Sequence, residues 1–260
     1  MASEGKASYG QSRRAQPLDK PKPTQFVQGF RQLLSTAMVA RDKQSGKELG
    51  KCIGVYAFYD YDGEPIYVGQ TAEKFSTRVG RHLQGQRSDT IAYRILDPFE
   101  VAEIELWPAE ELRSEPDKKE RLNALEYSVY LSAIEASRYR AILNEKMPPP
   151  GMTVRLPESY RFNLIPPDLR EEREHPDVRI ARRAETLARV AAVAHERGVV
   201  SSGLRRVIVI QAVRLADLAA ARLAQAEGRP VPSASAIDIK ELVGDVLGFP
   251  EEILDGFEEE

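Results

Sequence analysis

Hydrophobic positions recur at helical spacing in several parts of the chain. Near the N-terminus such a stripe predicts an amphipathic helix over residues 24–39. Its apolar positions are Phe26, Phe30, Leu33 and Leu34. A longer helix is predicted over residues 115–137, where Ser114 can serve as N-cap and Pro116 is tolerated in the first turn. Two further stripes predict a helical C-terminal region. Their members are Ile180, Ala184, Leu187, Ala191 and Ala194, and then Ile208, Ala212, Leu215 and Ala219.

Three segments between these helices have the pattern of β-strands, at residues 52–59, 65–68 and 101–107. The first two are separated by a turn that contains Asp62-Gly63, which is a hairpin signal. A short helix is predicted over residues 72–83. The sequence therefore predicts an α+β fold, with a small three-stranded antiparallel sheet flanked by helices and an added helical C-terminal region.

The predicted hairpin places two tyrosines on one face of the sheet. If the turn is symmetric about Asp62-Gly63, Phe58 faces Tyr67 and Tyr56 faces Gly69. Side chains alternate between the two faces along a strand, so both phenols and the Phe58 ring share a face. The sequence thus predicts a pair of neighbouring phenols on one side of the sheet.

A carboxylate in the apolar face of the long predicted helix is the sharpest sign of chemistry. Glu126 falls at an angle between Ala133 and Tyr130, inside that face. A glutamate is almost never buried unless it is paired or binds a metal. Arg78 and His82, which are four residues apart and share a helix face, or a divalent ion, could supply the cation. A structural ion pair with an arginine is the alternative.

Composition indicates an ordinary folded protein. Hydrophobic residues make up 42% of the 260 residues, which is enough for a core. No apolar run reaches eighteen residues and the N-terminus has no hydrophobic signal segment, so no membrane association is expected. The single cysteine, Cys52, excludes an intramolecular disulfide and a cysteine-based zinc cluster, and it fits a reducing, cytoplasmic location.

Charge is distributed unevenly. Residues 237–260 hold nine acidic residues and one lysine, whereas the rest of the chain holds 36 basic and 31 acidic residues. The formal net charge of −3 therefore combines an acidic C-terminal segment with a mildly basic remainder. The local electrostatic field, and not the total charge, attracts a phosphate backbone. We expect a disordered tail over 1–23, a domain over 24–150, a helical region over 151–236 and an acidic segment over 237–260.

The order of these residues resembles the GIY-YIG nuclease superfamily. Gly54-Val55-Tyr56 corresponds to the first signature of that family and Tyr67-Val68-Gly69 to the second. Four further residues of the family have counterparts here. Arg78 corresponds to its arginine, and His82 to the histidine one turn later. Glu126 corresponds to its metal-binding glutamate, and Asn144 to the asparagine after the long helix. The resemblance covers about residues 50–147.

This resemblance implies an endonuclease that hydrolyses phosphodiester bonds in DNA, with Glu126 holding one Mg²⁺ or Mn²⁺ per active site. Arg78 would donate two parallel hydrogen bonds to phosphate, and Asn144 would orient the metal-bound water or the phosphate. We favour Tyr56 as the general base, with Tyr67 and His82 in support. His82 is the alternative base, because an imidazole has an ordinary pKa of about 6.5.

Other basic residues are predicted to contact DNA beside this site; they are Lys74, Arg81 and Arg87. Near the C-terminal stripe stand Arg179, Arg182, Arg183 and Arg189. For these four, a solvated helix face is favoured over phosphate contacts. One active site cuts one strand, so cleavage of both strands requires a homodimer or two binding events.

The sequence leaves the biological role open between three kinds of nuclease. The N- and C-terminal extensions favour a restriction or defence enzyme over a DNA repair or recombination nuclease and a mobile-element endonuclease. The alternative to an enzyme is a non-catalytic nucleic-acid-binding module that retains the fold.

Overall fold

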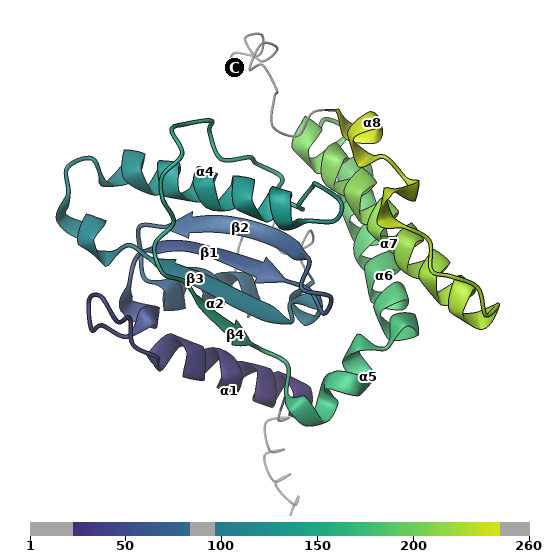
Figure 1. Ribbon diagram of the computed structural model, residues 1–260, viewed down its shortest axis with the longest axis horizontal. Coiled ribbons are helices and arrows are strands. Elements are labelled where there is room, and N and C mark those ends of the chain that lie inside the picture. The colour runs from purple at the N-terminus through teal and green to yellow at the C-terminus, as the bar shows by residue number, and fades with distance from the viewer. Residues whose placement is uncertain (1–22, 84–96, 245–260) are drawn as a thin grey trace, which may run out of the picture.

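A four-stranded antiparallel sheet lies at the centre of the computed structural model, which describes residues 23–83 and 97–244 (Figure 1). The strands are β1 (Gly54–Tyr59), β2 (Pro65–Thr71), β3 (Glu103–Pro108) and β4 (Tyr160–Asn163), in the spatial order β2-β1-β3-β4. The α+β class is confirmed. The predicted tail over 1–23 lies almost entirely outside the described residues, as does most of the acidic segment over 237–260.

The expectation of three strands was wrong by one. The fourth strand, β4, pairs antiparallel with β3, and Phe162 lies opposite Ile104. It lies within residues 151–236, a region for which only helices are predicted. Four residues between Pro157 and Pro166 are too few to show a clear alternation, so only pairing with the edge of β3 defines this strand.

The β1–β2 hairpin has the predicted register. Tyr56 lies opposite Gly69 and Phe58 lies opposite Tyr67. The turn is held by Asp60, whose carboxylate accepts hydrogen bonds from the backbone N–H groups of Asp62 at 2.9 Å and Glu64 at 3.0 Å. The two tyrosines therefore share one face of the sheet, as their spacing predicts.

Two glycines of the hairpin allow other groups to approach closely. A Cβ atom on Gly69 would lie 2.8 Å from the Tyr67 ring and 2.9 Å from the Tyr56 hydroxyl. A Cβ atom on Gly54 would lie 2.1 Å from the carbonyl oxygen of Trp107 in β3. Both positions exclude a side chain because the space is already filled.

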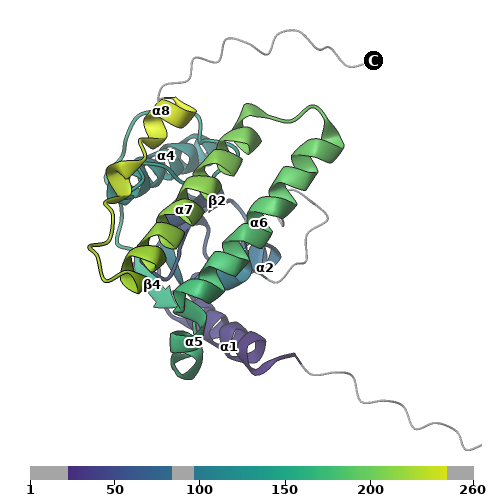
Figure 2. The same ribbon diagram turned by 90° about the vertical axis from the view of Figure 1, so that its right-hand side faces the viewer.

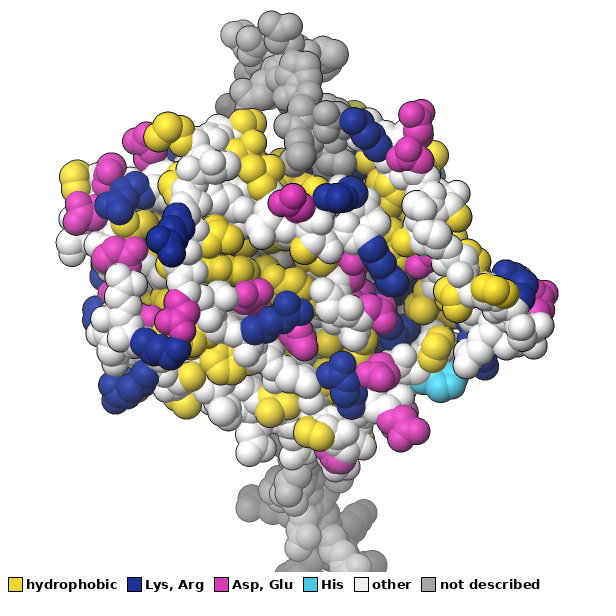
Figure 3. All heavy atoms as spheres, in the orientation of Figure 1, with side chains coloured by type: hydrophobic (Ala, Val, Ile, Leu, Met, Phe, Trp, Pro, Cys, Tyr) yellow, Lys and Arg dark blue, Asp and Glu magenta, His cyan; other side chains and the backbone are white. Residues whose placement is uncertain are grey.

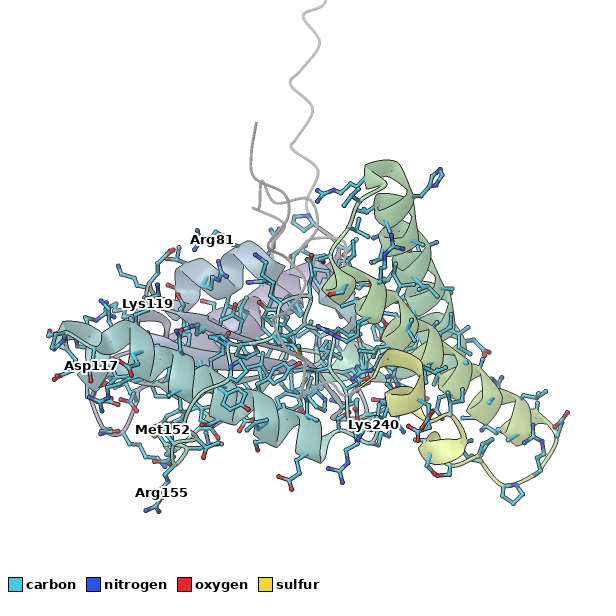
Figure 4. The ribbon with its side chains drawn as sticks, turned by 90° about the horizontal axis from the view of Figure 1, so that it is seen from above. Arg81, Asp117, Lys119, Met152, Arg155 and Lys240 are labelled. Atoms are coloured by element: carbon cyan, nitrogen blue, oxygen red, sulfur yellow. The ribbon has the colours of Figure 1, made fainter. Side chains whose placement is uncertain are left out.

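Helices cover both faces of the sheet, with α2 and α4 on opposite sides (Figure 4). They are α1 (Gln25–Val39), α2 (Phe75–Leu83) and α4 (Lys118–Ala136). The Thr24 side chain caps α1 by accepting a hydrogen bond from Val27, and Phe26, Phe30 and Leu34 are buried as predicted. The predicted start of α4 was wrong, because Ser114 ends a 3-10 turn (Glu110–Ser114) and the helix begins at Lys118.

The C-terminal region is helical, as predicted, and packs beside the sheet. It consists of α5 (Arg170–Glu174), α6 (Pro176–Arg197), α7 (Ser202–Ala226) and α8 (Ile239–Val243). Helices α6 and α7 form an antiparallel pair (Figure 2). Within the described residues, no helix combines the length and apolar character needed to cross a membrane.

The prediction of a solvated arginine face on α6 was wrong for Arg179, Arg182 and Arg183, whereas Arg189 is exposed as predicted. Arg179 and Arg183 are buried, and Arg179 makes a bidentate ion pair with Asp62 at 2.8 and 3.0 Å. Arg183 bonds Asp60 at 2.7 Å, and the half-buried Arg182 bonds Asp97. These charges are satisfied by acids of the nuclease-like region, so they dock α6 onto the β1–β2 turn and are not available to phosphates.

Candidate active site

Three rings come together on the α2 side of the sheet. The Tyr56 and Tyr67 centroids are 6.0 Å apart, and the His82 ring lies 5.8 Å from Tyr56 and 5.2 Å from Tyr67. Phe58 stacks on Tyr67 at 5.9 Å. The alternation of side chains along the β1–β2 hairpin places both tyrosines on this face of the sheet, and His82 comes from the last turn of α2.

Arg78 stands one helical turn before His82 and adjoins the Tyr56 hydroxyl. Its guanidinium is half-buried, and the neighbouring phenols and Glu73 raise its pKa despite the opposing effect of burial. Its Nε is buried without a hydrogen-bond partner. A half-buried guanidinium with an unpartnered Nε is suited to bind a phosphate.

Glu126 projects from α4 toward the outer edge of β2. Burial raises the pKa of this carboxyl from 4.5 to about 7, opposed by hydrogen bonding to the backbone and side chain of Gln70 and by the charge of Arg78. In the part of the chain that the structure describes, Glu126 belongs to no ion pair within 4.0 Å. The structural ion pair considered from sequence is therefore not formed, and the carboxylate is not neutralised by a protein cation.

Asn144 has a structural task that its predicted role did not include. It is 4% exposed, its Nδ2 donates to the carbonyl of Val68 at 2.7 Å, and its Oδ1 accepts from the Val68 N–H at 3.0 Å. Because β2 is an edge strand, these backbone groups have no strand partner. Asn144 thus acts as a substitute for a neighbouring strand beside Tyr67.

Comparison with models of protein families matches residues 52–126 to the GIY-YIG catalytic domain. The chain contains a GIY-YIG domain. No curated protein and no solved structure matches the chain. The matched segment runs from the first signature to Glu126, so it includes both tyrosines, Arg78 and His82. Asn144 and the C-terminal helices lie beyond it.

The predicted DNA contacts beside this GIY-YIG site differ in their surroundings. Lys74 is exposed at the start of α2. Arg81 is bound to Glu73 at 2.8 Å, which reduces its availability. Arg87 lies outside the described residues. From above, Arg81 on α2 and Lys119 on α4 stand on the two sides of the β2 edge (Figure 4).

Two polar residues of the site did not stand out from the sequence. Gln70 follows the second signature on β2, and its side-chain N–H donates to Asn123 of α4 at 2.6 Å. Asn123 is three residues before Glu126, so it shares the same helix face. The three-residue spacing could have identified Asn123 from the sequence. A helix that places Glu126 at the edge of β2 also places Asn123 near this edge.

The donor set fits a hydrated cation more closely than a protein cage. Among the described residues, no three His, Cys, Asp or Glu side chains form a metal-binding group. A lone carboxylate with a raised pKa and no ion-pair partner suits Mg²⁺, which binds through one or two carboxylates and keeps several waters. Glu126 is the residue that would hold it.

The Tyr56 phenol is not primed as a base in the free protein. It is completely buried, and burial together with Tyr67 raises its pKa well above 10, while Arg78 opposes that rise. Its hydroxyl has no hydrogen bond of ordinary geometry. A basic role for Tyr56 therefore requires a further positive charge at the site to lower its pKa.

Proposed function

We propose that this protein is a metal-dependent DNA endonuclease that hydrolyses phosphodiester bonds at the edge of β2. The observation that carries the proposal is the convergence of Arg78, Glu126 and the Tyr56–Tyr67–His82 ring cluster around one sheet edge. Phosphodiester hydrolysis needs an activated water, neutralisation of charge on the phosphate and stabilisation of the leaving oxygen. This set of side chains can serve all three needs.

Each residue has a distinct role in the proposal. Arg78 binds the non-bridging phosphate oxygens, which increase in charge during the reaction. Glu126 holds one Mg²⁺ or Mn²⁺, which supplies Lewis-acid chemistry when bound. Tyr56 accepts the proton of the attacking water once its pKa is lowered, and Tyr67 and His82 orient it. Asn144 positions β2 through its hydrogen bonds to Val68.

The β2 edge is the proposed route for DNA. On the face drawn in Figure 3, the described basic and acidic side chains are interspersed, and no broad basic patch gathers there. Such a face offers a phosphate backbone little net attraction. Three basic residues that could contact this backbone, Lys74, Arg78 and Arg81, come from α2 or from the residue just before it.

Plasmid cleavage with a matched pair of variants tests this function. Purified protein should nick or linearise plasmid in the presence of Mg²⁺, and Glu126→Gln should remove this activity. Glu135→Gln is the control, because it removes an exposed carboxylate from the same helix. Equal cleavage by Glu126→Gln and wild type, or none by wild type on duplex, branched and single-stranded DNA, would contradict the proposal.

A restriction or defence role is the finer form of this proposal. It is supported by the additions to the GIY-YIG domain, namely α1 and the α5–α8 region, which pack against it. Sequencing the ends of cleavage products distinguishes a fixed recognition sequence from the structure-directed cuts of a repair or recombination nuclease. Cutting of both strands at one position would also indicate a homodimer or two successive binding events.

A further inference from the structure

The segment that carries Asn144 is held between two arginines of α7. Arg214 is 1% exposed, and its guanidinium donates to the carbonyls of Pro65 at 2.8 Å and Ala141 at 3.0 Å. Arg206 donates to the carbonyls of Asn144 and Glu145, both at 3.3 Å. One arginine thus holds each end of residues 141–145, and Arg214 also holds the start of β2.

The dimensions of the helix and the segment match. Arg206 and Arg214 are eight positions apart, which is about 12 Å and about 2.2 turns along a helix, so they lie within about 80° of each other around its axis. Four extended steps, from residue 141 to residue 145, cover about 13 Å. Between the two ends, the Leu143 N–H donates to the Ile66 carbonyl at 3.0 Å, so the segment follows β2 over its length.

Close packing leaves little freedom at the Arg206 end. A Cβ atom on Gly203 would lie 1.9 Å from the Glu145 carbonyl oxygen, so only glycine lets the first turn of α7 approach this far. Ser201, the N-cap of α7, also donates to the Glu145 carboxylate at 2.8 Å. The helix and the segment are therefore fixed to each other by backbone contact as well as by charge.

We infer that Arg206 and Arg214 are positioning residues of the nuclease site. They hold residues 141–145 against β2, and through the Asn144–Val68 hydrogen bonds they fix the strand that carries Tyr67. The α7 helix is then an integral part of the site, although it lies outside the GIY-YIG match. The effect on cleavage rests on the proposed nuclease function, whereas the effect on β2 does not.

Hydrogen exchange of single amides tests this inference without needing activity. In Arg206→Ala, the Val68 amide should exchange at least tenfold faster, whereas the Leu106 amide of the interior strand β3 should not change. Arg206→Lys should restore part of the protection, since an ammonium can reach a carbonyl. Arg222→Ala is the matched control, because it removes an exposed ion pair with Asp177 from the same helix.

Cleavage kinetics give the second measurement. Arg206→Ala should lower kcat about tenfold or more and leave KM for DNA nearly unchanged, because the phosphate-binding groups stay in place. Gly203→Ala, which displaces α7 without removing charge, should act in the same direction if Arg206→Ala does not fold. Unchanged exchange at Val68, or equal acceleration at Val68 and Leu106, would overturn the inference. Loss of the proposed function alone would appear as no cleavage by wild type with the exchange pattern intact.

Discussion

Replacing Glu126 with glutamine should make the metal-free protein more stable at neutral pH. The reason is the environment of the carboxyl, which is half-buried against β2 and has a pKa raised to about 7 by burial. Glutamine keeps the shape and can still accept the hydrogen bond from the Gln70 backbone, but it carries no charge. The variant therefore removes the cost of ionising a partly buried acid.

The size of this gain follows from the pKa. A rise from 4.5 to about 7 corresponds to about 3 kcal/mol. Between those two values the unfolded chain has released the proton while the folded chain retains it. The free energy of unfolding of the wild type therefore falls, relative to the variant, as the pH rises through this window. The difference should be near zero at pH 4 and reach its full value above pH 7.

Urea denaturation from pH 4 to pH 8 measures this difference, with Glu135→Gln as the exposed control. Excess Mg²⁺ should then stabilise wild type at pH 8 by binding the ionised carboxylate, and should not stabilise Glu126→Gln. A stability difference that does not depend on pH would refute the raised pKa of Glu126. Equal stabilisation of both proteins by Mg²⁺ would refute Glu126 as the metal ligand.

Three other substitutions test separate parts of the site. Asn144→Ala should lower the free energy of unfolding by about 2 to 4 kcal/mol in urea titrations, because it leaves the Val68 N–H and carbonyl without partners. A loss below about 0.5 kcal/mol would contradict the role of Asn144 as a substitute for a neighbouring strand. Gly69→Ala should cost about 1 to 3 kcal/mol in the same assay by forcing the Tyr56 and Tyr67 rings apart. Lys74→Gln should reduce the slope of log Kd against log salt by about 1 if it contacts a phosphate, whereas the exposed Lys240→Gln on α8 (Figure 4) should leave it unchanged.

Local sequence patterns were sufficient for the hairpin and for much of the site. The register that joins Tyr56 to Gly69 and Phe58 to Tyr67 depends only on the turn and on alternation along the strands, and the structure has it. Helical spacing placed His82 on the same face as Arg78, and the family resemblance associated both with the tyrosines. Glu126 stood out because a carboxylate on an apolar face is costly. These are short-range rules, and each involves residues that are close in sequence or share one helix.

Features that depend on pairing between distant segments were not accessible in the same way. Asn144 bonds Val68 at a sequence separation of 76 residues, and an asparagine after a helix is equally typical of a turn. Strand β4 exists because β3 offers an open edge, which its own four residues do not reveal. In both cases the partner determines the structure, and a single sequence does not identify the partner.

The arginines of α6 and α7 show how charge can be misinterpreted when only local patterns are considered. Charged side chains usually lie in water, and arginines spaced three and four apart normally indicate a solvated face. Here Arg179 and Arg183 are buried against Asp60 and Asp62, and Arg214 lies against Glu64. The β1–β2 turn places three acids within five residues, and this acidic cluster could have indicated the partners of the buried arginines.

This network also bears on how the additions serve the catalytic domain. Buried ion pairs add little stability compared with apolar contacts, but removal of one partner is costly because the other charge is left unpaired. A docking surface of this kind therefore accepts one arrangement of α6 and α7 and penalises others. The hairpin that carries both tyrosines is thereby tied at its turn to α6 and along its β2 edge to α7. Loss of Asp60 or Arg183 should then disturb the active site from its far end, even though neither residue approaches the phosphate.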